Sequence, residues 1–304
     1  MAQKRNKSLF GTLRKIGIVA PASPCDKKKL VAGIEILKQN GIEVLAGENL
    51  FRTCRFSYLS ADDSCRAADL NKMTADSSID AILCTRGGYG TPRILELIDY
   101  NLLRERNLPI IGFSDITALH LAMSARNAGV GIASQMTARL PEAIHSRSTV
   151  AGMKRVYSLL SNPAGTFRKL GRTLRCLNRN KSVSGQILPL NLTLTASLCG
   201  TDFLPGTDGK IVILEEIGEP VRKIDKMLHQ LYYSGFFRGT AAVIFAQFTD
   251  CGNRNEQTLL FNDFAEQIQC PVFTGLNFGH ELPSFSFLFG EDCLIEEGNL
   301  SVRG

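Results

Sequence analysis

The 304-residue sequence lacks three patterns that mark common classes of protein. Its nine cysteines include no C-x-x-C pair, so neither a zinc site nor a disulfide framework is indicated, and we expect free thiols in a reducing compartment. No stretch approaches the ~18 consecutive apolar residues of a membrane-spanning helix. The apolar run 16–20 is too short for a signal peptide and meets Pro21 at once. We therefore expect a cytoplasmic protein.

Positive charge is in excess but is scattered. The formal net charge is +6, and Lys and Arg are dense only between Lys4 and Arg14–Lys15, which favours a solvated arm over a segment that binds nucleic acid or lipid. The hydrophobic fraction of 44% and the charged fraction of 21% are typical of a soluble globular protein. We expect neither nucleic acid nor membrane as a partner.

Strand-like and helix-like segments alternate through the first half of the chain. Buried strands are expected at 15–20, 42–46, 79–84, 110–113 and 131–134, and helices at 26–39, 61–73, 91–99, 116–123 and 148–160. This alternation predicts an α/β fold with a parallel sheet covered on both faces, and sites in such sheets form at the C-terminal ends of the strands. The second half mixes strands (210–214, 241–245), helices (224–231, 257–268) and a hairpin at 293–302.

Composition divides the chain into four parts. We expect a flexible tail over residues 1–14 and an N-terminal α/β domain over 15–160. A linker rich in Arg, Lys, Asn and Gly, with short β-like pieces, would cover 161–182, and a smaller C-terminal β/α domain would cover 183–304.

A serine lies where one predicted strand meets a helix. Ser114 follows the apolar run that ends at Phe113, and helical spacing begins at Ile116. A serine at a sharp strand-to-helix turn is placed as a nucleophile, although Gly112-x-Ser114-x-Ile116 lacks the second glycine of G-x-S-x-G. The alternative is that Ser114 is only the N-cap of the helix.

A serine nucleophile needs a base, and the chain has four histidines: His120, His145, His229 and His280. His280 follows Gly279 in a loop, a placement that suits an aimed imidazole but also a structural histidine. Glu215 and Glu216 follow the apolar run 211–214, where a carboxylate would orient the base or would simply be solvated.

Glycines follow the predicted strand 79–84 in Thr85-Arg86-Gly87-Gly88-Tyr89-Gly90. The loop matches neither G-x-x-x-x-G-K-[ST] nor G-x-G-x-x-G, which disfavours a nucleotide. An oxyanion hole shared with the Asp115 N–H is the other reading. Cys84, at the end of the strand, competes as a nucleophile, but core packing explains it more simply.

Taken together, these segments resemble the LD-carboxypeptidases of peptidase family S66, over roughly residues 15–300. The motifs that carry the resemblance are 18–23, 61–70, Arg86-Gly87-Gly88-Tyr89-Gly90, 111–119, Leu214-Glu215-Glu216, 224–228 and Gly279-His280. It implies a Rossmann-like or class I amidotransferase-like N-terminal domain beside a smaller β/α domain, usually as a homodimer.

The resemblance also implies a function. Such enzymes remove the terminal D-Ala from murein tetrapeptides at an L,D bond in the bacterial cytoplasm, as part of peptidoglycan recycling, without metal or cofactor. By motif match Ser114 is the nucleophile, His280 the base and Glu215 its orienting acid, with the backbone N–H groups of Gly88 and Asp115 as the oxyanion hole. Candidate substrate-binding residues are Gly87, Tyr89 and Asn191.

Three segments depart from the family pattern, at 134–136, 189–190 and 222–226, where Lys226 replaces an arginine. These departures leave two alternatives to the murein peptidase. One is a peptidase of the microcin self-immunity type that hydrolyses peptidyl or aminoacyl nucleotides, and the other is a muropeptide-binding protein without catalysis.

Overall fold

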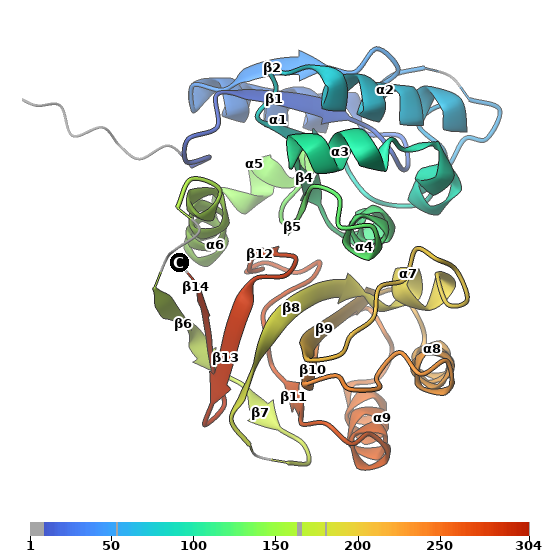
Figure 1. Ribbon diagram of the computed structural model, residues 1–304, viewed down its shortest axis with the longest axis vertical. Helices are drawn as coiled ribbons and strands as arrows, with labels where there is room; N and C mark the ends of the chain where they lie inside the picture. The colour runs from blue at the N-terminus through green and yellow to red at the C-terminus, as the bar shows by residue number, and fades with distance from the viewer. Residues whose placement is uncertain (1–8, 53, 163–165, 180, 304) are drawn as a thin grey trace, which may run out of the picture.

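A six-stranded sheet organises the first half of the molecule (Figure 1). The computed structural model describes residues 9–52, 54–162, 166–179 and 181–303. The strand order is β12-β5-β4-β3-β1-β2, and all neighbours are parallel except β12, which runs antiparallel to β5. The strands are β1 (Lys15–Val19), β2 (Glu43–Ala46), β3 (Ala81–Cys84), β4 (Pro109–Gly112), β5 (Val130–Ala133) and β12 (Phe287–Leu288).

Helices cover both faces of this sheet, because its central strands are apolar on both sides. Apolar side chains of α2 (Asp63–Ala75), α3 (Tyr100–Arg106) and α4 (Thr117–Ala125) belong to the core on one face. Those of α1 (Lys27–Gln39), α5 (Leu140–Ala143) and α6 (Arg147–Leu159) belong to the core on the other. Short 3-10 helices η1 (Thr91–Leu97), η2 (Ser114–Ile116) and η3 (Thr137–Arg139) follow β3, β4 and β5.

The second half is built on an eight-stranded mixed sheet of order β6-β14-β13-β8-β9-β10-β11-β7. Strands β8 to β11 are mutually parallel, and the flanking strands are antiparallel to their neighbours. The elements are β6 (Phe167–Thr173), β7 (Arg175–Cys176), β8 (Val183–Asn191), α7 (Leu192–Ser197), β9 (Lys210–Ile217), α8 (Val221–Tyr233), β10 (Ala242–Thr249), α9 (Arg254–Gln267), β11 (Val272–Thr274), β13 (Asp292–Glu296) and β14 (Asn299–Arg303).

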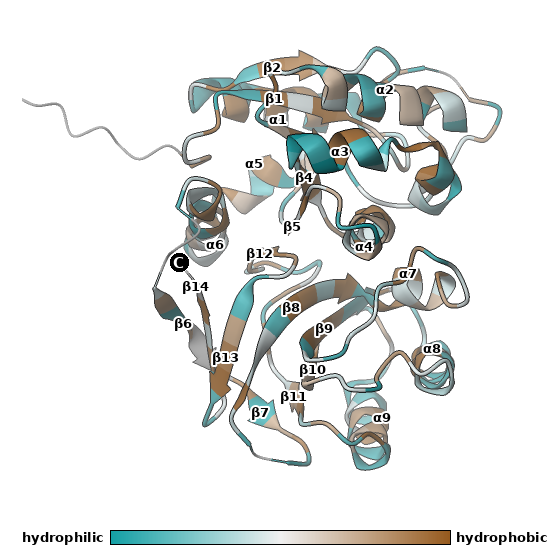
Figure 2. Cartoon of the chain, in the orientation of Figure 1, coloured by the Kyte–Doolittle hydropathy of each residue, from teal (hydrophilic) through white to brown (hydrophobic). Residues whose placement is uncertain are grey.

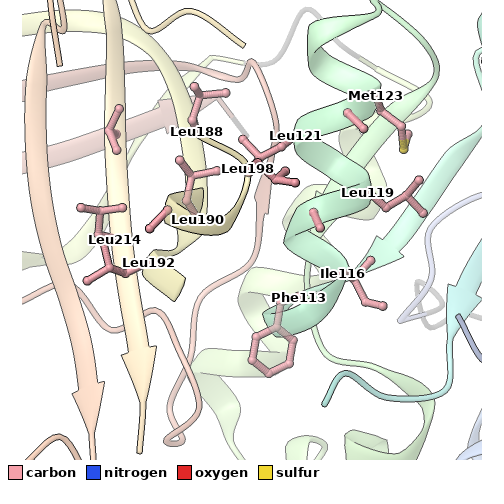
Figure 3. Packing of buried hydrophobic residues seen from close by; sticks show 14 of the residues in the cluster. Phe113, Ile116, Leu119, Leu121, Met123, Leu188, Leu190, Leu192, Leu198 and Leu214 are labelled. Carbon is pink, nitrogen blue, oxygen red and sulfur yellow. The ribbon is translucent and has the colours of Figure 1, made fainter. Parts of the chain in front are cut away.

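One apolar cluster joins the two sheets. Leu121 of α4 lies on the side of the helix that faces Leu190 of β8 and Leu198 at the end of α7, whereas Leu119 and Met123 lie on the opposite side of α4, in the same cluster (Figure 3). Figure 2 shows the same organisation as hydrophobic colour along the central strands and hydrophilic colour on the outer surfaces of the helices. The relative position of the two sheets is therefore fixed by buried apolar packing.

The alternation of strands and helices predicted for the first half is confirmed, and the fold is α/β with two sheets. Two details differ in this half. Residues 91–99, expected as a helix, form η1, and α3 was not expected. The sixth strand, β12, comes from the far end of the chain, which local patterns do not reveal.

The segments predicted as a tail and as a linker also make contacts that the sequence analysis did not assign to them. The expected linker 161–182 is more than a connector, because β6 pairs with β14 and β7 pairs with β11. Within the expected tail, Leu9, Phe10 and Leu13 are buried, and the Phe10 and Tyr157 rings lie 5.3 Å apart. Residues 1–8 lie outside the described residues. None of the helices in the described part of the chain combines the length and apolar character needed to cross a bilayer.

Candidate active site

A cavity of about 300 Å³ opens at the C-terminal ends of β3, β4 and β5. Its position follows the rule for parallel sheets, where loops after the strands converge at one edge. The residues that line it are Cys25, Asp26, Lys29, Arg86, Gly87, Gly88, Phe113, Ser114, Met136, Ala138, Arg139 and His280. Two of the predicted triad residues, Ser114 and His280, therefore share one cavity: Ser114 follows β4 of the first sheet, and His280 lies in the loop between β11 of the second sheet and β12 of the first.

Ser114 occupies a strained turn directly after β4. Its φ is 62°, a left-handed conformation that is uncommon for a residue other than glycine and that recurs at functional sites. Its hydroxyl caps neither η2 nor α4. A Cβ on Gly87 would lie 3.0 Å from the Ser114 Cβ and 3.1 Å from Oγ, so only glycine leaves room for the serine at this turn. The geometry is that of a nucleophile elbow and not of an N-cap.

The glycine loop after β3 lies against this turn. Gly88 has a φ of 113°, which an L side chain rarely adopts, and a Cβ on Gly87 would lie 3.2 Å from the Asp115 backbone nitrogen. Among the described residues, the Gly88 and Asp115 N–H groups donate to no backbone carbonyl. Backbone donors that are held at a nucleophile and left unsatisfied are suited to stabilise an oxyanion.

Two buried charged side chains hold the loop in place. The Asp115 carboxylate accepts a hydrogen bond from the Thr91 N–H at 2.8 Å, and burial raises the pKa of that carboxyl. The buried Arg66 donates to the carbonyls of Pro21, Ala61 and Gly90, at 2.9 Å to Gly90. Because the C-terminal end of the loop is fixed in this way, its N–H groups need little reorganisation on binding.

His280 is held from behind by a buried carboxylate. Its Nδ1 lies 2.8 Å from Glu215 Oε2, and the Glu215 side chain is only 1% exposed. Asn191 Nδ2 donates to the other Glu215 oxygen at 3.0 Å. The His280 ring packs against Phe113, with centroids 4.9 Å apart, and Arg139 Nη2 donates to the His280 carbonyl at 3.2 Å. Both the ring orientation and the loop are thereby fixed.

The neighbouring carboxylate has a different task. Glu216 accepts hydrogen bonds from the Thr193 N–H at 2.8 Å, the Thr193 hydroxyl at 2.7 Å and the Ile217 N–H at 2.8 Å. Burial raises the pKa of its carboxyl. Glu215 and Glu216 are therefore not a solvated pair: the first faces His280, and the second anchors the start of α7.

The other sequence candidates lie elsewhere. His120 is buried, its Nε2 lies 2.9 Å from the Ile110 carbonyl, and burial lowers its pKa to about 4, so it is a neutral core residue. His229 pairs with Asp225 at 2.9 Å on α8. His145 follows α5 in an exposed turn. Cys84 is fully buried, which raises the pKa of its thiol and leaves no accessible thiolate.

The candidate substrate-binding residues separate in the structure. Gly87 lines the cavity, whereas Tyr89 and Asn191 are not among its lining residues. Tyr89 is half exposed, and its ring packs edge-on against Tyr58 at 5.6 Å. Asn191 lies behind Glu215. Within the described ranges, no group of three or more His, Cys, Asp or Glu side chains is arranged to hold a metal ion.

Sequence reasoning missed the cationic wall of the cavity, which consists of Lys29, Arg86 and Arg139. A usable signal was present, because Arg86 lies two residues after the end of β3, and Lys29 lies in the first turn of the helix after β1. Of the three departures from the family pattern, only 134–136 reaches the cavity, through Met136. Residues 189–190 are buried in β8, and 222–226 lie on α8.

Comparison with known proteins agrees with this arrangement. The family model of the LD-carboxypeptidase N-terminal domain matches residues 16–134, and that of the C-terminal domain matches residues 184–295. A probable murein peptide carboxypeptidase from Bacillus subtilis is 31% identical over 90% of this chain and 86% of its own. A murein tetrapeptide carboxypeptidase from Pseudomonas aeruginosa is 28% identical over 94% of each chain.

Solved structures show the same fold. A muramoyltetrapeptide carboxypeptidase from Oxalobacter formigenes superposes with a TM-score of 0.81 at 24% identity, covering 95% of this chain and 97% of its own. The microcin C7 self-immunity protein bound to glutamyl sulfamoyl guanosine superposes with a TM-score of 0.84 at 19% identity, covering 96% of each chain. Since the two family models together span most of the sequence, the chain belongs to the LD-carboxypeptidase family, peptidase family S66.

Proposed function

We propose that this protein is a serine-type carboxypeptidase that releases the terminal D-Ala from murein tetrapeptides. The observation that carries the proposal is the 2.8 Å contact between Glu215 and His280 at the wall of a cavity that also contains the strained Ser114. A nucleophile, a base and an orienting acid are the parts that acyl transfer needs. The names of the relatives from Bacillus subtilis and Pseudomonas aeruginosa support a murein peptide as the substrate.

The first half of the reaction forms an acyl-enzyme. Because Nδ1 of His280 is bonded to Glu215, Nε2 is the nitrogen that is left to accept the Ser114 proton. The serine oxygen attacks the carbonyl carbon of the L,D bond, and the N–H groups of Gly88 (or Gly87) and Asp115 receive the negative charge on the carbonyl oxygen. Loss of one such donor typically costs about 2.7–4 kcal/mol of transition-state stabilisation.

The tetrahedral intermediate then collapses to the acyl-enzyme as the bond between the carbonyl carbon and the D-Ala nitrogen breaks, and hydrolysis releases the shortened peptide. The imidazolium gives its proton to the amine of the departing D-Ala, and Glu215 stabilises the positive charge until then. A water molecule, deprotonated by the same His280, then attacks the acyl-serine ester and restores the hydroxyl. Each step uses protein groups and water alone.

Mass spectrometry of one reaction tests the proposal. The substrate is L-Ala-γ-D-Glu-meso-diaminopimelate-D-Ala, incubated with the parent protein, with Ser114→Ala and with Ser124→Ala, a control in the following helix. The parent and Ser124→Ala are expected to release one alanine, and Ser114→Ala is not. Turnover by Ser114→Ala would contradict the nucleophile. Turnover of an aminoacyl-sulfamoyl adenosine with none of the tetrapeptide would contradict the substrate.

The cellular location and assembly belong to the same proposal. We propose a cytoplasmic homodimer, consistent with the free thiols at all nine cysteine positions. Cell fractionation and light scattering test the two statements separately. Recovery in a periplasmic fraction would contradict the first, and a single-chain mass near 33.3 kDa would contradict the second.

A further inference from the structure

The covalent geometry of the substrate limits where a carboxypeptidase can recognise the end of its peptide. Only one residue follows the bond that is cut, so the free carboxyl carbon lies three bonds from the reacting carbonyl carbon. Bond lengths of about 1.3–1.5 Å keep the two carbons within about 4 Å of each other. The group that binds the carboxylate must therefore line the same cavity as Ser114.

Three cations line that cavity, and two of them already have a carboxylate partner. Lys29 Nζ lies 3.5 Å from Glu142 Oε1, and Arg139 Nε lies 3.4 Å from Glu142 Oε2. Arg139 also donates to the His280 carbonyl. These two side chains are therefore held by the protein itself.

Arg86 differs from both. Its Nε donates to the Gly87 carbonyl at 3.2 Å, and its Nη1 donates to the Pro24 carbonyl at 3.5 Å. In the parts of the chain that the structure describes, no carboxylate lies within ion-pair distance of its guanidinium. Asp26, the one acid on the cavity wall, uses Oδ1 to cap α1 through the Lys29 N–H at 2.9 Å. Arg86 thus retains donors for an incoming anion.

The guanidinium also has the right position. Arg86 Nη2 would lie 3.5 Å from a Cβ on Gly88, so it packs directly against the proposed oxyanion donor. A substrate whose carbonyl oxygen meets the Gly88 N–H would bring its terminal carboxylate, one residue further on, to this side chain. An arginine can grip a carboxylate through two parallel hydrogen bonds.

We infer that Arg86 binds the terminal carboxylate of the substrate and thereby restricts cleavage to the last residue of the peptide. The inference rests on the proposed function and adds the residue that makes the enzyme a carboxypeptidase. A peptide amide, or a chain that continues past the cut, would place an uncharged group against the guanidinium and would lose the ion pair.

The test compares the tetrapeptide with its C-terminal amide. For the parent we expect kcat/KM for the acid to exceed that for the amide by about 10- to 100-fold. Arg86→Gln is expected to lower the value for the acid much more than that for the amide, mainly through KM, so that the preference for the acid is lost. Arg86→Lys keeps the charge without the fork and is expected to retain part of the preference. Arg139→Gln is the matched control. It should lower kcat/KM for the acid and for the amide by the same factor, because Arg139 positions His280.

Equal loss of acid and amide turnover in Arg86→Gln, or an unchanged preference, would overturn the inference. Calorimetry in the Ser114→Ala background separates binding from chemistry. If the parent cleaves neither peptide, the proposed reaction is wrong. The inference about Arg86 is still supported if Ser114→Ala binds the acid more tightly than the amide and if adding Arg86→Gln removes that difference in affinity. Binding without preference, or no binding, overturns Arg86 as well. Circular dichroism of each variant shows that it is folded.

Discussion

The two sheets contribute unequally to the active-site cavity. Every residue that lines the cavity comes from the segment 25–139, around the first sheet, except His280. His280 lies in the loop that runs from β11 of the second sheet to β12 of the first, and behind it lies the Glu215 carboxylate at the end of β9 in the second sheet. The first region therefore holds Ser114, the backbone donors and the cations, whereas the proposed acid comes from β9 and the proposed base from the loop after β11.

Because of this division, the alignment of Ser114 with His280 depends on how the two regions pack against each other. Ser114 and His280 reach the same cavity because the two regions pack together, among other contacts through α4 on β8 and α7 (Figure 3) and through the Arg139 hydrogen bond to the His280 carbonyl. A displacement of about 1 Å between reacting groups can cost on the order of 10²-fold in rate. The predictions below test whether each region has the task that the geometry gives it.

The largest effect is expected from the acid of the second region. Glu215→Gln removes the charge that holds the His280 tautomer and stabilises the imidazolium, so kcat should fall by about 10³- to 10⁴-fold with KM little changed. The adjacent Glu216→Gln is the control. It weakens the anchor of α7, costs about 1–3 kcal/mol of unfolding free energy and leaves kcat within about tenfold.

Steady-state release of D-Ala and urea unfolding measure the two variants side by side. Equal loss of kcat in both would mean that Glu215 acts only through the fold. The comparison is sharp because the two carboxylates are neighbours on one strand and both are buried.

The next effect belongs to the first region. In Gly87→Ala the new methyl group would lie 3.0 Å from the Ser114 Cβ and 3.2 Å from the Asp115 nitrogen, so it must displace the serine or the oxyanion donor. We expect kcat/KM to fall by about 10²- to 10³-fold with little change in the unfolding midpoint. Gly206→Ala, where nothing lies within 4 Å of the new methyl group, should leave both quantities unchanged. Normal turnover in Gly87→Ala would contradict the assignment of the glycine loop.

A feature of this site can be predicted from the sequence when the residues that determine it lie close together along the chain. The turn at Ser114 and the glycine loop are local, because an apolar strand followed by helical spacing is written within a few residues. The contact between Arg139 and His280 spans 141 positions, and the pairing of β12 with β5 joins the last part of the chain to the first sheet. Such contacts depend on how the two sheets meet, which no local pattern records.

The same limit applies to the segment 161–182 and to Glu216. The segment 161–182 has the composition of a linker, yet β6 and β7 gain hydrogen-bonding partners only when β14 and β11 are in place. Glu216 gives the same lesson at the level of one side chain. Its sequence position predicts a solvated strand end, but Glu216 is buried, and Thr193 of α7 supplies two donors beside the N–H of the neighbouring Ile217.

A smaller effect on activity is expected from the apolar junction. Leu121 on α4 belongs to the cluster that joins the sheets, whereas Leu37 on α1 belongs to the core on the far face of the first sheet, and both are fully buried. Either change to alanine should cost about 2–5 kcal/mol of unfolding free energy. Only Leu121→Ala should also lower kcat, by about tenfold, at a temperature where both variants remain folded. Equal activity in the two variants would show that the junction tolerates a cavity without loss of alignment.

The smallest effect is a pH dependence that the two regions share. Asp115 in the first and Glu216 in the second are buried carboxyls whose pKa values burial raises above their ordinary values of 3.8 and 4.5. Between the ordinary and the raised pKa, the folded protein holds a proton that the unfolded chain has released. The stability that each carboxyl contributes is therefore fully present below its ordinary pKa and is lost as pH rises through the raised one. Asp115→Asn and Glu216→Gln do not titrate, so each should reduce the fall in unfolding free energy between pH 4 and neutrality, as measured by urea titration at each pH. If only one variant changed the pH dependence of the unfolding free energy, burial would raise the pKa of only that carboxyl. A steeper fall of the unfolding free energy in either variant would mean that the folded protein lowers the pKa of the replaced carboxyl.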